Sequence, residues 1–218
     1  MSAAAPATRP SSGPLSLADE KRDVARTRIL RAARIVLAER GLATTVDDVA
    51  AAADVSRRTI FRHFETRERL LAEAIREGLR SYSQQLPTAG LAAAADQAEV
   101  AAWLENLLIA AHRLNANNGR IYWELAALGS ELDGELAVVA AERRDSRRRF
   151  ATRVTAHAWS AVGGTGRPPA WLTDAFAVHL SGFTTQALGG DFGRTPDDVA
   201  RTSARVLQAA LTAALAPS

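Results

Sequence analysis

Two helix-start signals follow one another closely within residues 45–67, TVDDVAAAADVSRRTIFRHFETR. Thr45 can act as an N-cap, because its hydroxyl can accept a hydrogen bond from a free backbone N–H, and Asp48 completes a pattern like a capping box. Ser56 is a second N-cap after a short break in the apolar pattern. The segment therefore predicts two short helices joined by a tight turn.

The second of these helices has one apolar face and one basic face. Val55 and Ile60 have the spacing of a hydrophobic staple, which would fix the angle at which the helix leaves the turn. Ile60 and Phe64, four residues apart, would anchor the helix to a core. The opposite face carries Arg57, Arg58, Thr59, Arg62 and His63. Arginine can pair with guanine O6 and N7 in the major groove, so this helix predicts a helix-turn-helix reader of double-stranded DNA.

A longer, gap-free pattern surrounds this segment. It consists of Arg26-x-x-Ile29-Leu30-x-Ala32-Ala33, Gly41, Thr45-Val46-x-x-Val49-Ala50, Val55-Ser56-x-x-Thr59-Ile60-Phe61-x-His63-Phe64 and Leu70. With this pattern, residues 26–72 resemble the DNA-binding domain of the TetR family of bacterial regulators. The resemblance implies an all-α chain, with an N-terminal three-helix DNA-binding domain followed by a C-terminal helical domain that binds a ligand and forms dimers.

Three positions depart from the family's pattern. Phe61 replaces a tyrosine and cannot donate a hydroxyl hydrogen bond to phosphate, so it is expected only to pack. Arg67 replaces a lysine and keeps the positive charge that a phosphate contact requires. Arg58 stands where a small residue is common, which predicts more contact with guanine. The predicted DNA-binding residues are Thr45, Ser56, Arg57, Arg58, Thr59, Phe61, Arg62, His63 and Arg67, with a packing role left open for His63.

Charge and composition set limits on the other classes of function. Residues 20–80 hold 14 Lys and Arg against 10 Asp and Glu, a net charge of +4, whereas residues 81–218 hold 12 against 13. The positive charge thus lies in the predicted DNA-binding part, as phosphate attraction requires. The chain has no cysteine, no long apolar run and no signal-peptide pattern, so we expect a cytoplasmic protein without disulfides or membrane contact.

The chain divides into three segments. Residues 1–19 are rich in Ala, Pro and Ser and predict a disordered tail. Residues 20–85 form the predicted DNA-binding domain with its linking helix, and residues 86–218 the ligand-binding and dimerisation domain. Further helices are expected at residues 98–114, 121–128, 134–160, 172–187 and 196–215, with loops at the Asn-rich residues 115–119 and at the glycine pair 189–190.

Aromatic side chains and histidines are concentrated after residue 100 and could line an apolar cavity, which the resemblance implies. The candidates are Trp103, Leu107, His112, Tyr122, Trp123, His157, Trp159, Phe176, His179 and Phe183, each with core packing as the alternative. The histidines have no paired ligand spacing, so no metal and no other cofactor is expected. The run 143–149, RRDSRRR, is expected to be a solvated helix face.

The last two helices repeat apolar residues at helical spacing, and the resemblance implies a homodimer through a four-helix bundle. The predicted interface comprises Leu172, Phe176, Leu180, Ala204, Leu207 and Leu211, with an internal core stripe as the alternative. The function implied is that of a transcriptional repressor released from a palindromic operator by a partly apolar small molecule. An activator, a ligand-independent DNA-binding protein and a helical enzyme with a DNA-reading appendage remain alternatives, although no catalytic residue is indicated.

Overall fold

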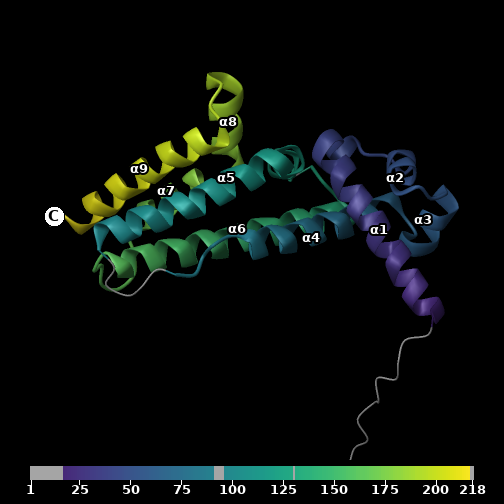
Figure 1. The fold of residues 1–218 in the computed structure, drawn as a ribbon, viewed down its shortest axis with the longest axis horizontal. Coiled ribbons are helices and arrows are strands. Elements are labelled where there is room, and N and C mark those ends of the chain that lie inside the picture. Colours follow the sequence, from purple (N-terminus) through teal and green to yellow (C-terminus); the bar gives the residue numbers. More distant parts are fainter. Residues whose placement is uncertain (1–16, 91–95, 130, 217–218) are drawn as a thin grey trace, which may run out of the picture.

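The computed structural model describes residues 17–90, 96–129 and 131–216, and within them it contains nine α-helices, one 3-10 turn and no strand (Figure 1). The elements are α1 Leu17–Arg40, η1 Gly41–Ala43, α2 Val46–Ala53, α3 Arg57–Phe64, α4 Arg67–Gln85, α5 Gln97–Ala127, α6 Gly134–Ala161, α7 Ala170–His179, α8 Gly182–Phe192 and α9 Pro196–Leu215. The all-α prediction is therefore confirmed. Helix α1 includes residues 17–19, which were expected in the tail, and residues 1–16 lie outside the described residues.

The predicted caps explain where the N-terminal helices begin. Thr45 accepts a hydrogen bond from the N–H of Asp48 and donates its own N–H to that carboxylate, which completes the capping box of α2. Ser56 accepts from the N–H of Thr59 at the start of α3. Between the two helices Asp54 adopts a left-handed conformation at φ 50°, and the chain turns sharply there.

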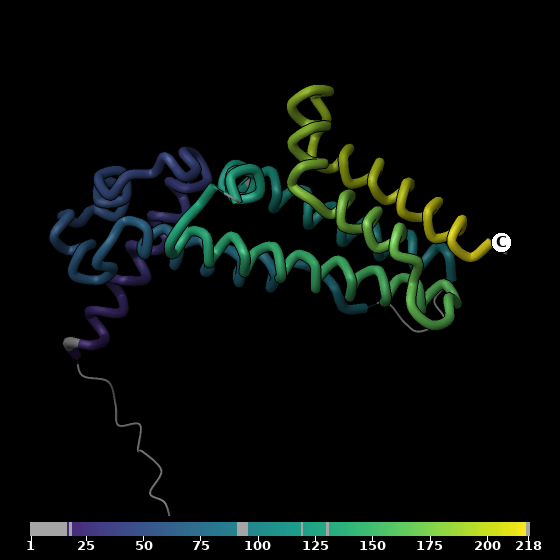
Figure 2. Tube along the Cα trace, turned by 180° about the vertical axis from the view of Figure 1, so that it is seen from behind, coloured from purple at the N-terminus to yellow at the C-terminus, as the bar shows by residue number. Residues whose placement is uncertain are grey.

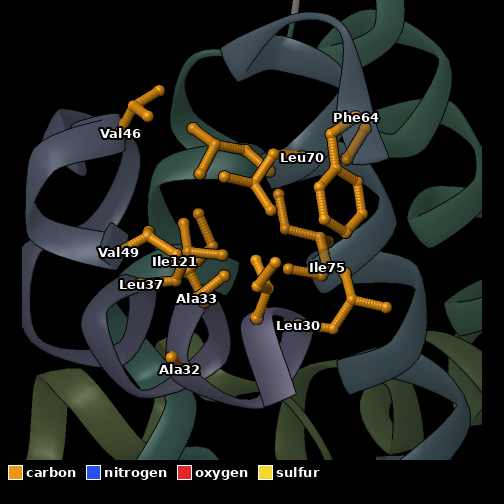
Figure 3. Close-up of a cluster of buried hydrophobic side chains, with 14 of the residues drawn as sticks. Leu30, Ala32, Ala33, Leu37, Val46, Val49, Phe64, Leu70, Ile75 and Ile121 are labelled. Carbon is orange, nitrogen blue, oxygen red and sulfur yellow. The ribbon is translucent and has the colours of Figure 1, made fainter. Parts of the chain in front are cut away.

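The N-terminal helices do not have a core of their own. Ile29, Ile60 and Phe64 are fully buried in a cluster that also includes Ile121 of α5 and Val139 of α6. Figure 3 shows Ile121 among side chains from α1, α2 and α4. Because apolar side chains from both predicted domains share this cluster, burial of the same surface holds the helix-turn-helix against the long helices.

A second cluster lies at the other end of the molecule, where α9 runs beside α5 and α7 beside α6 (Figure 2). Its fully buried side chains include Leu104 and Leu107 of α5 and Leu207 of α9. Helix α8 stands away from the long axis of the molecule (Figure 1). The arrangement joins the two ends through α4, α5 and α6.

The Asn-rich segment 115–119 is helical, so the predicted loop there is wrong. Helix α5 runs without a break through this segment. Asn115 is buried and its Oδ1 accepts a hydrogen bond from the Tyr82 hydroxyl, 3.2 Å away, while Asn118 donates to the carbonyl of Leu114. These bonds give each of the two asparagine side chains a partner within the folded chain, where asparagine in isolation favours a turn.

The helix predicted over residues 172–187 is in fact two helices. Ser181 has an extended backbone and accepts from the N–H of Thr184, so it caps a new helix, α8. Helix α8 continues through Gly189 and Gly190 and ends at Gly193, which takes a left-handed φ of 64°. The prediction that the glycine pair ends the helix is therefore wrong. No helix among the described residues combines the length and apolar composition needed to cross a membrane.

Candidate nucleic-acid interface and ligand cavity

Helix α3 is held by its apolar face and leaves its basic face in solvent. Ile60 and Phe64 are fully buried, and Val55 packs against the same cluster. The hydroxyls of Ser56 and Thr59 lie 3.0 Å apart and hydrogen bond to each other at the exposed start of the helix. The expected staple and anchor thus position α3 on α1, α2 and α4.

Two arginines of α3 are exposed and available. Arg58 and Arg62 make no hydrogen bond or ion pair with any other described residue. Arg57 differs, because its guanidinium pairs with Asp47 of α2 at 2.9 Å and lies 6.0 Å from the centre of the Phe61 ring. An unpaired guanidinium can form bidentate bonds to a base edge or a phosphate without first breaking a protein contact.

Phe61 and His63 are the two aromatic side chains among the predicted DNA-binding residues of α3. Phe61 is 39% exposed, so its ring lies at the surface beside Arg57. His63 turns inward, and its Nε2 is buried without a hydrogen-bond partner in the described part of the chain. Burial, with nearby arginines, lowers the pKa of His63. The packing alternative is the arrangement observed for His63, and Nε2 is not presented to a groove.

Arg67 is engaged within the protein. Its Nε donates to the carbonyl of Thr44 at 2.8 Å, and a second nitrogen donates to the carbonyl of Leu42. Its third nitrogen faces Glu68 at 3.2 Å. The side chain ties the start of α4 to the turn before α2, which differs from the free phosphate-binding cation that was expected. Thr45 likewise uses its hydroxyl in the α2 cap.

The same turn is also bonded to α5. The carboxylate of Glu124 on α5 accepts from the N–H of Leu42 at 2.5 Å and pairs with Arg120 at 2.9 Å. Arg120 in turn donates to the carbonyl of Glu39 at 3.3 Å. The turn η1 is therefore bonded to α4 on one side and to α5 on the other.

A cavity of about 100 Å³ lies between α4, α5, α6 and the junction of α7 with α8. Its walls include apolar side chains from three of these helices, such as Leu79, Phe150 and Leu180. Polar groups also line it, among them Tyr82, Asn115, Tyr122, Arg143, Arg147 and Arg153. A concave, partly apolar site with a few polar groups is the usual form of a small-molecule site.

Of the predicted ligand-binding residues, Tyr122 alone is among the residues that line this cavity. Trp123 and Phe183 are 46% and 42% exposed, and the exposed His157 makes an edge-to-face contact with the buried Trp103, 5.5 Å between ring centres. Side chains packed elsewhere are Leu107, Trp159, Phe176, and the histidines His112 and His179, which bond to Thr185 and Ser203. Helical periodicity identified these residues as apolar or aromatic, but it could not distinguish a cavity wall from a close-packed core.

The arginine run on α6 is a further correction. Arg143 is only 8% exposed and Arg147 is partly buried, although the run was expected to be solvated. Their positions four residues apart place them on one helix face, followed by Phe150. This spacing was the available sequence signal for the cavity wall.

The six predicted dimerisation residues face the chain's own core. Leu172, Phe176, Leu180, Ala204, Leu207 and Leu211 are all at most 7% exposed and pack with α5 and α6. This burial agrees with the internal-stripe alternative, because a side chain already covered within one chain has little surface left for a second. Other apolar side chains of the last three helices are exposed, namely Trp171 and Val178 of α7, Phe183 of α8 and Val206 of α9. Among the described residues, no group of three or more His, Asp or Glu side chains could hold a metal ion.

The helix-turn-helix segment is similar to a known family of regulators. Residues 29–74, from the second half of α1 to the first part of α4, match the family model described as bacterial regulatory proteins, tetR family. Residues 29–74 form a TetR-family helix-turn-helix domain. A comparison with curated proteins finds no significant match.

The TetR-type fold extends over the rest of the chain. A TetR-family transcriptional regulator from Streptomyces coelicolor is 20% identical with a TM-score of 0.63, over 88% of this chain and 81% of that one. A putative TetR-family regulator from Rhodococcus sp. is 17% identical with a TM-score of 0.58, over 89% and 100% of the two chains. The TetR-like regulator LfrR from Mycobacterium smegmatis, solved in complex with proflavine, is 22% identical with a TM-score of 0.53, over 91% and 99%. The chain thus has the fold of TetR-family transcriptional regulators.

Proposed function

We propose that the chain is a sequence-specific DNA-binding repressor that leaves a palindromic operator when a small molecule binds. Residues 20–85 would bind DNA, and residues 86–218 would bind the ligand and form the dimer. Arg58 and Arg62 would contact base edges or phosphates, and Arg57 would join them after exchanging Asp47 for a phosphate. The protein would act without catalysis or a cofactor.

The observation that supports ligand control is the path of helix α4. Near its end, Leu79, Tyr82 and Ser83 line the cavity, and at its start Arg67 bonds to the turn before α2. A ligand that changes the position of α4 would therefore move the helix-turn-helix. It can do so only if it binds two conformations with unequal affinity. The complex of LfrR with proflavine supports a small-molecule site in proteins of this fold.

A dimer would use the outer faces of the last helices. Val178 of α7 and Val206 of α9 are 57% and 42% exposed, and apolar surface of this kind favours association. Two copies would hold their recognition helices about 34–36 Å apart, the spacing of successive major grooves. We expect Val206→Arg to lower the dimer fraction in sedimentation velocity, whereas Val138→Arg, at a site on α6 that is 51% exposed, should leave it unchanged.

The first experiment is selection of bound sequences from a randomised duplex pool at near-physiological salt. Recovery of a palindrome with half-sites about one helical turn apart would support the proposal. Binding of all sequences with similar affinity, both in the free protein and with small molecules added, would contradict it.

A further inference from the structure

The cavity contains a buried cation without a buried anion. Only 8% of Arg143 is exposed. Its guanidinium makes no hydrogen bond or ion pair with any other described residue. Its nearest aromatic contact is the Tyr122 ring, whose centre lies 6.0 Å from Arg143 Cζ. A guanidinium that lines a cavity and has no protein partner is available to pair with an anion there.

The rest of the wall adds positive charge and supplies no carboxylate. Arg147 and Arg153 also line the cavity, and no Asp or Glu is among its lining residues. Arg147 has one partner, the carbonyl of Ala177, to which it donates at 2.7 Å. Three arginines, of which Arg153 is exposed, thus line a space that has no carboxylate among its lining residues.

The two tyrosines cannot provide the missing negative charge. Burial raises the pKa of Tyr122 to about 12 and raises that of Tyr82 as well, so both hydroxyls stay protonated at neutral pH. Burial lowers the pKa of Arg143 to about 10, which still leaves the guanidinium charged at neutral pH. The site therefore keeps its positive charge under ordinary conditions.

Two further groups could bind an anion. Asn115 is 5% exposed, and its Nδ2 is buried without a hydrogen-bond partner in the described residues, although its Oδ1 accepts from Tyr82. Gly182, the first residue of α8, also lines the cavity, so the positive end of that helix faces it. An unpaired buried amide donor and a helix start both favour a negatively charged oxygen.

The apolar wall and the volume limit what else the ligand can be. Leu79, Leu86, Phe150 and Leu180 supply aliphatic and aromatic surface. The volume of about 100 Å³ is similar in scale to engineered cavities of roughly 150 Å³ that hold a single benzene ring. The cavity therefore has room for a ligand with one ring or a short alkyl chain.

We propose that the effector is a small monocarboxylic acid whose carboxylate pairs with Arg143 and Arg147 and whose apolar body lies against Phe150 and the leucines. This inference rests on the proposed function only in calling the ligand an effector. The carboxylate accepts from the two guanidinium groups and from Asn115 Nδ2, and it neutralises the unpaired cation. Pairing with Arg147 draws that side chain from the carbonyl of Ala177, which connects ligand binding to the end of α7.

The test measures binding to the full chain without DNA, by isothermal titration calorimetry at constant ionic strength. The probes are benzoate with benzamide and benzylamine, and hexanoate with hexanamide and hexylamine, which share a body and differ in charge. We expect at least one acid to bind ten-fold or more tightly than its amide, and the amines not to bind. An amide or amine that binds as tightly as its acid, or failure of both acids to bind, would overturn the proposal.

Substitutions of Arg143 and Arg147 test whether these side chains cause the preference for the acid over its amide. Arg143→Met should abolish the ten-fold preference for the acid, and Arg147→Met should reduce it. Arg148→Met, at an exposed position on the same helix, is the matched control and should keep the preference. Circular dichroism establishes that each variant is folded, and the comparison of acid with amide in the wild-type chain does not depend on any variant. Retention of the preference in both cavity variants would overturn the assignment.

The same measurements separate this inference from the proposed function. A chain that selects a DNA palindrome but binds neither acid keeps the regulator function and loses the acid site. A chain that binds acids through Arg143 but selects no DNA sequence keeps the acid site and loses the regulator function.

Discussion

Glu124 on α5 and Leu42 in the turn before α2 are joined by a hydrogen bond of 2.5 Å across 82 positions of the chain. The acceptor belongs to α5, which contributes to the wall of the cavity, and the donor is a backbone N–H beside the helix-turn-helix. Arg67 of α4 donates to the carbonyl of the same Leu42. The backbone N–H of Leu42 is therefore bonded to α5 and its carbonyl to α4. Movement of either helix would change the turn.

Loss of the Glu124 carboxylate should destabilise this connection. Glu124→Ala leaves the partly buried N–H of Leu42 without its acceptor, and we expect a loss of about 1–3 kcal/mol in unfolding free energy. Urea denaturation followed by circular dichroism measures it. Glu131→Ala, at an exposed position, is the control. Equal small losses in the two variants would show that the bond contributes nothing measurable.

Gly41 should not tolerate a side chain. It has a left-handed φ of 60°, and a Cβ built on it would overlap the carboxylate of Glu124. Gly193 has a similar φ of 64° with no atom within 4 Å of such a Cβ. We expect Gly193→Ala to cost roughly 1–2 kcal/mol from backbone strain alone. Gly41→Ala should cost at least roughly 1 kcal/mol more, because Glu124 must leave Leu42. Thermal unfolding of both variants gives the difference, and equal losses would argue against the overlap.

Arg58 is expected to carry sequence preference. Arg58→Ala should weaken binding to the selected operator by roughly 1–3 kcal/mol and relax the base preference, while binding to a scrambled duplex changes less. Fluorescence anisotropy titrations at one fixed salt concentration measure both affinities. Arg148→Ala, an exposed arginine on α6, controls for the lost charge. Full operator affinity and full preference in Arg58→Ala would remove Arg58 from the interface.

His112 should make the fold sensitive to mild acid. Burial lowers the pKa of His112 to about 4 from the ordinary 6.5, so the unfolded chain binds a proton more readily than the folded chain. The stability linked to this group is present above pH 6.5 and is lost as the pH falls through about 4, by roughly 3 kcal/mol in all. Burial also lowers the pKa of His63 and of His179, and these shifts act with the same sign.

Urea denaturation at a series of pH values between 7 and about 4 measures this loss. His112→Gln should reduce the slope of unfolding free energy against pH, although the variant also loses the 2.7 Å bond to Thr185 and starts from lower stability. His157→Gln, at an exposed histidine, is the matched control. A wild-type slope in His112→Gln would show that His112 is not the group that titrates.

Local signals in the sequence were sufficient for the N-terminal helices. Thr45 with Asp48, Ser56 and Thr66 each cap the start of a helix, because each side chain accepts a hydrogen bond from a backbone N–H three residues later. These interactions span three or four residues, so the sequence contains both partners. The same holds for Thr195 and Asp198 at the start of α9.

The sequence was less informative where a residue's partner lies far along the chain. Asn115 favours a loop in isolation but lies within α5, where its Oδ1 accepts a hydrogen bond from Tyr82 of α4. Arg143 belongs to a run that resembles a solvated face, yet the packing of α4 and α5 against α6 buries it in a cavity wall. Leu207 and Leu211 form an apolar stripe that fits a dimer interface or a core equally well.

The sequence by itself determined that the chain is helical, where most of its helices begin, and that α3 presents arginines on the face opposite Ile60 and Phe64. Those properties follow from caps and from the 3.6-residue period, which act within a few turns of one helix. Only the tertiary structure decided which polar side chains are buried, which apolar stripe faces inward, and that Glu124 bonds to Leu42. Those properties depend on the packing of helices distant in sequence, because burial and long-range hydrogen bonds require surfaces that no single segment contains.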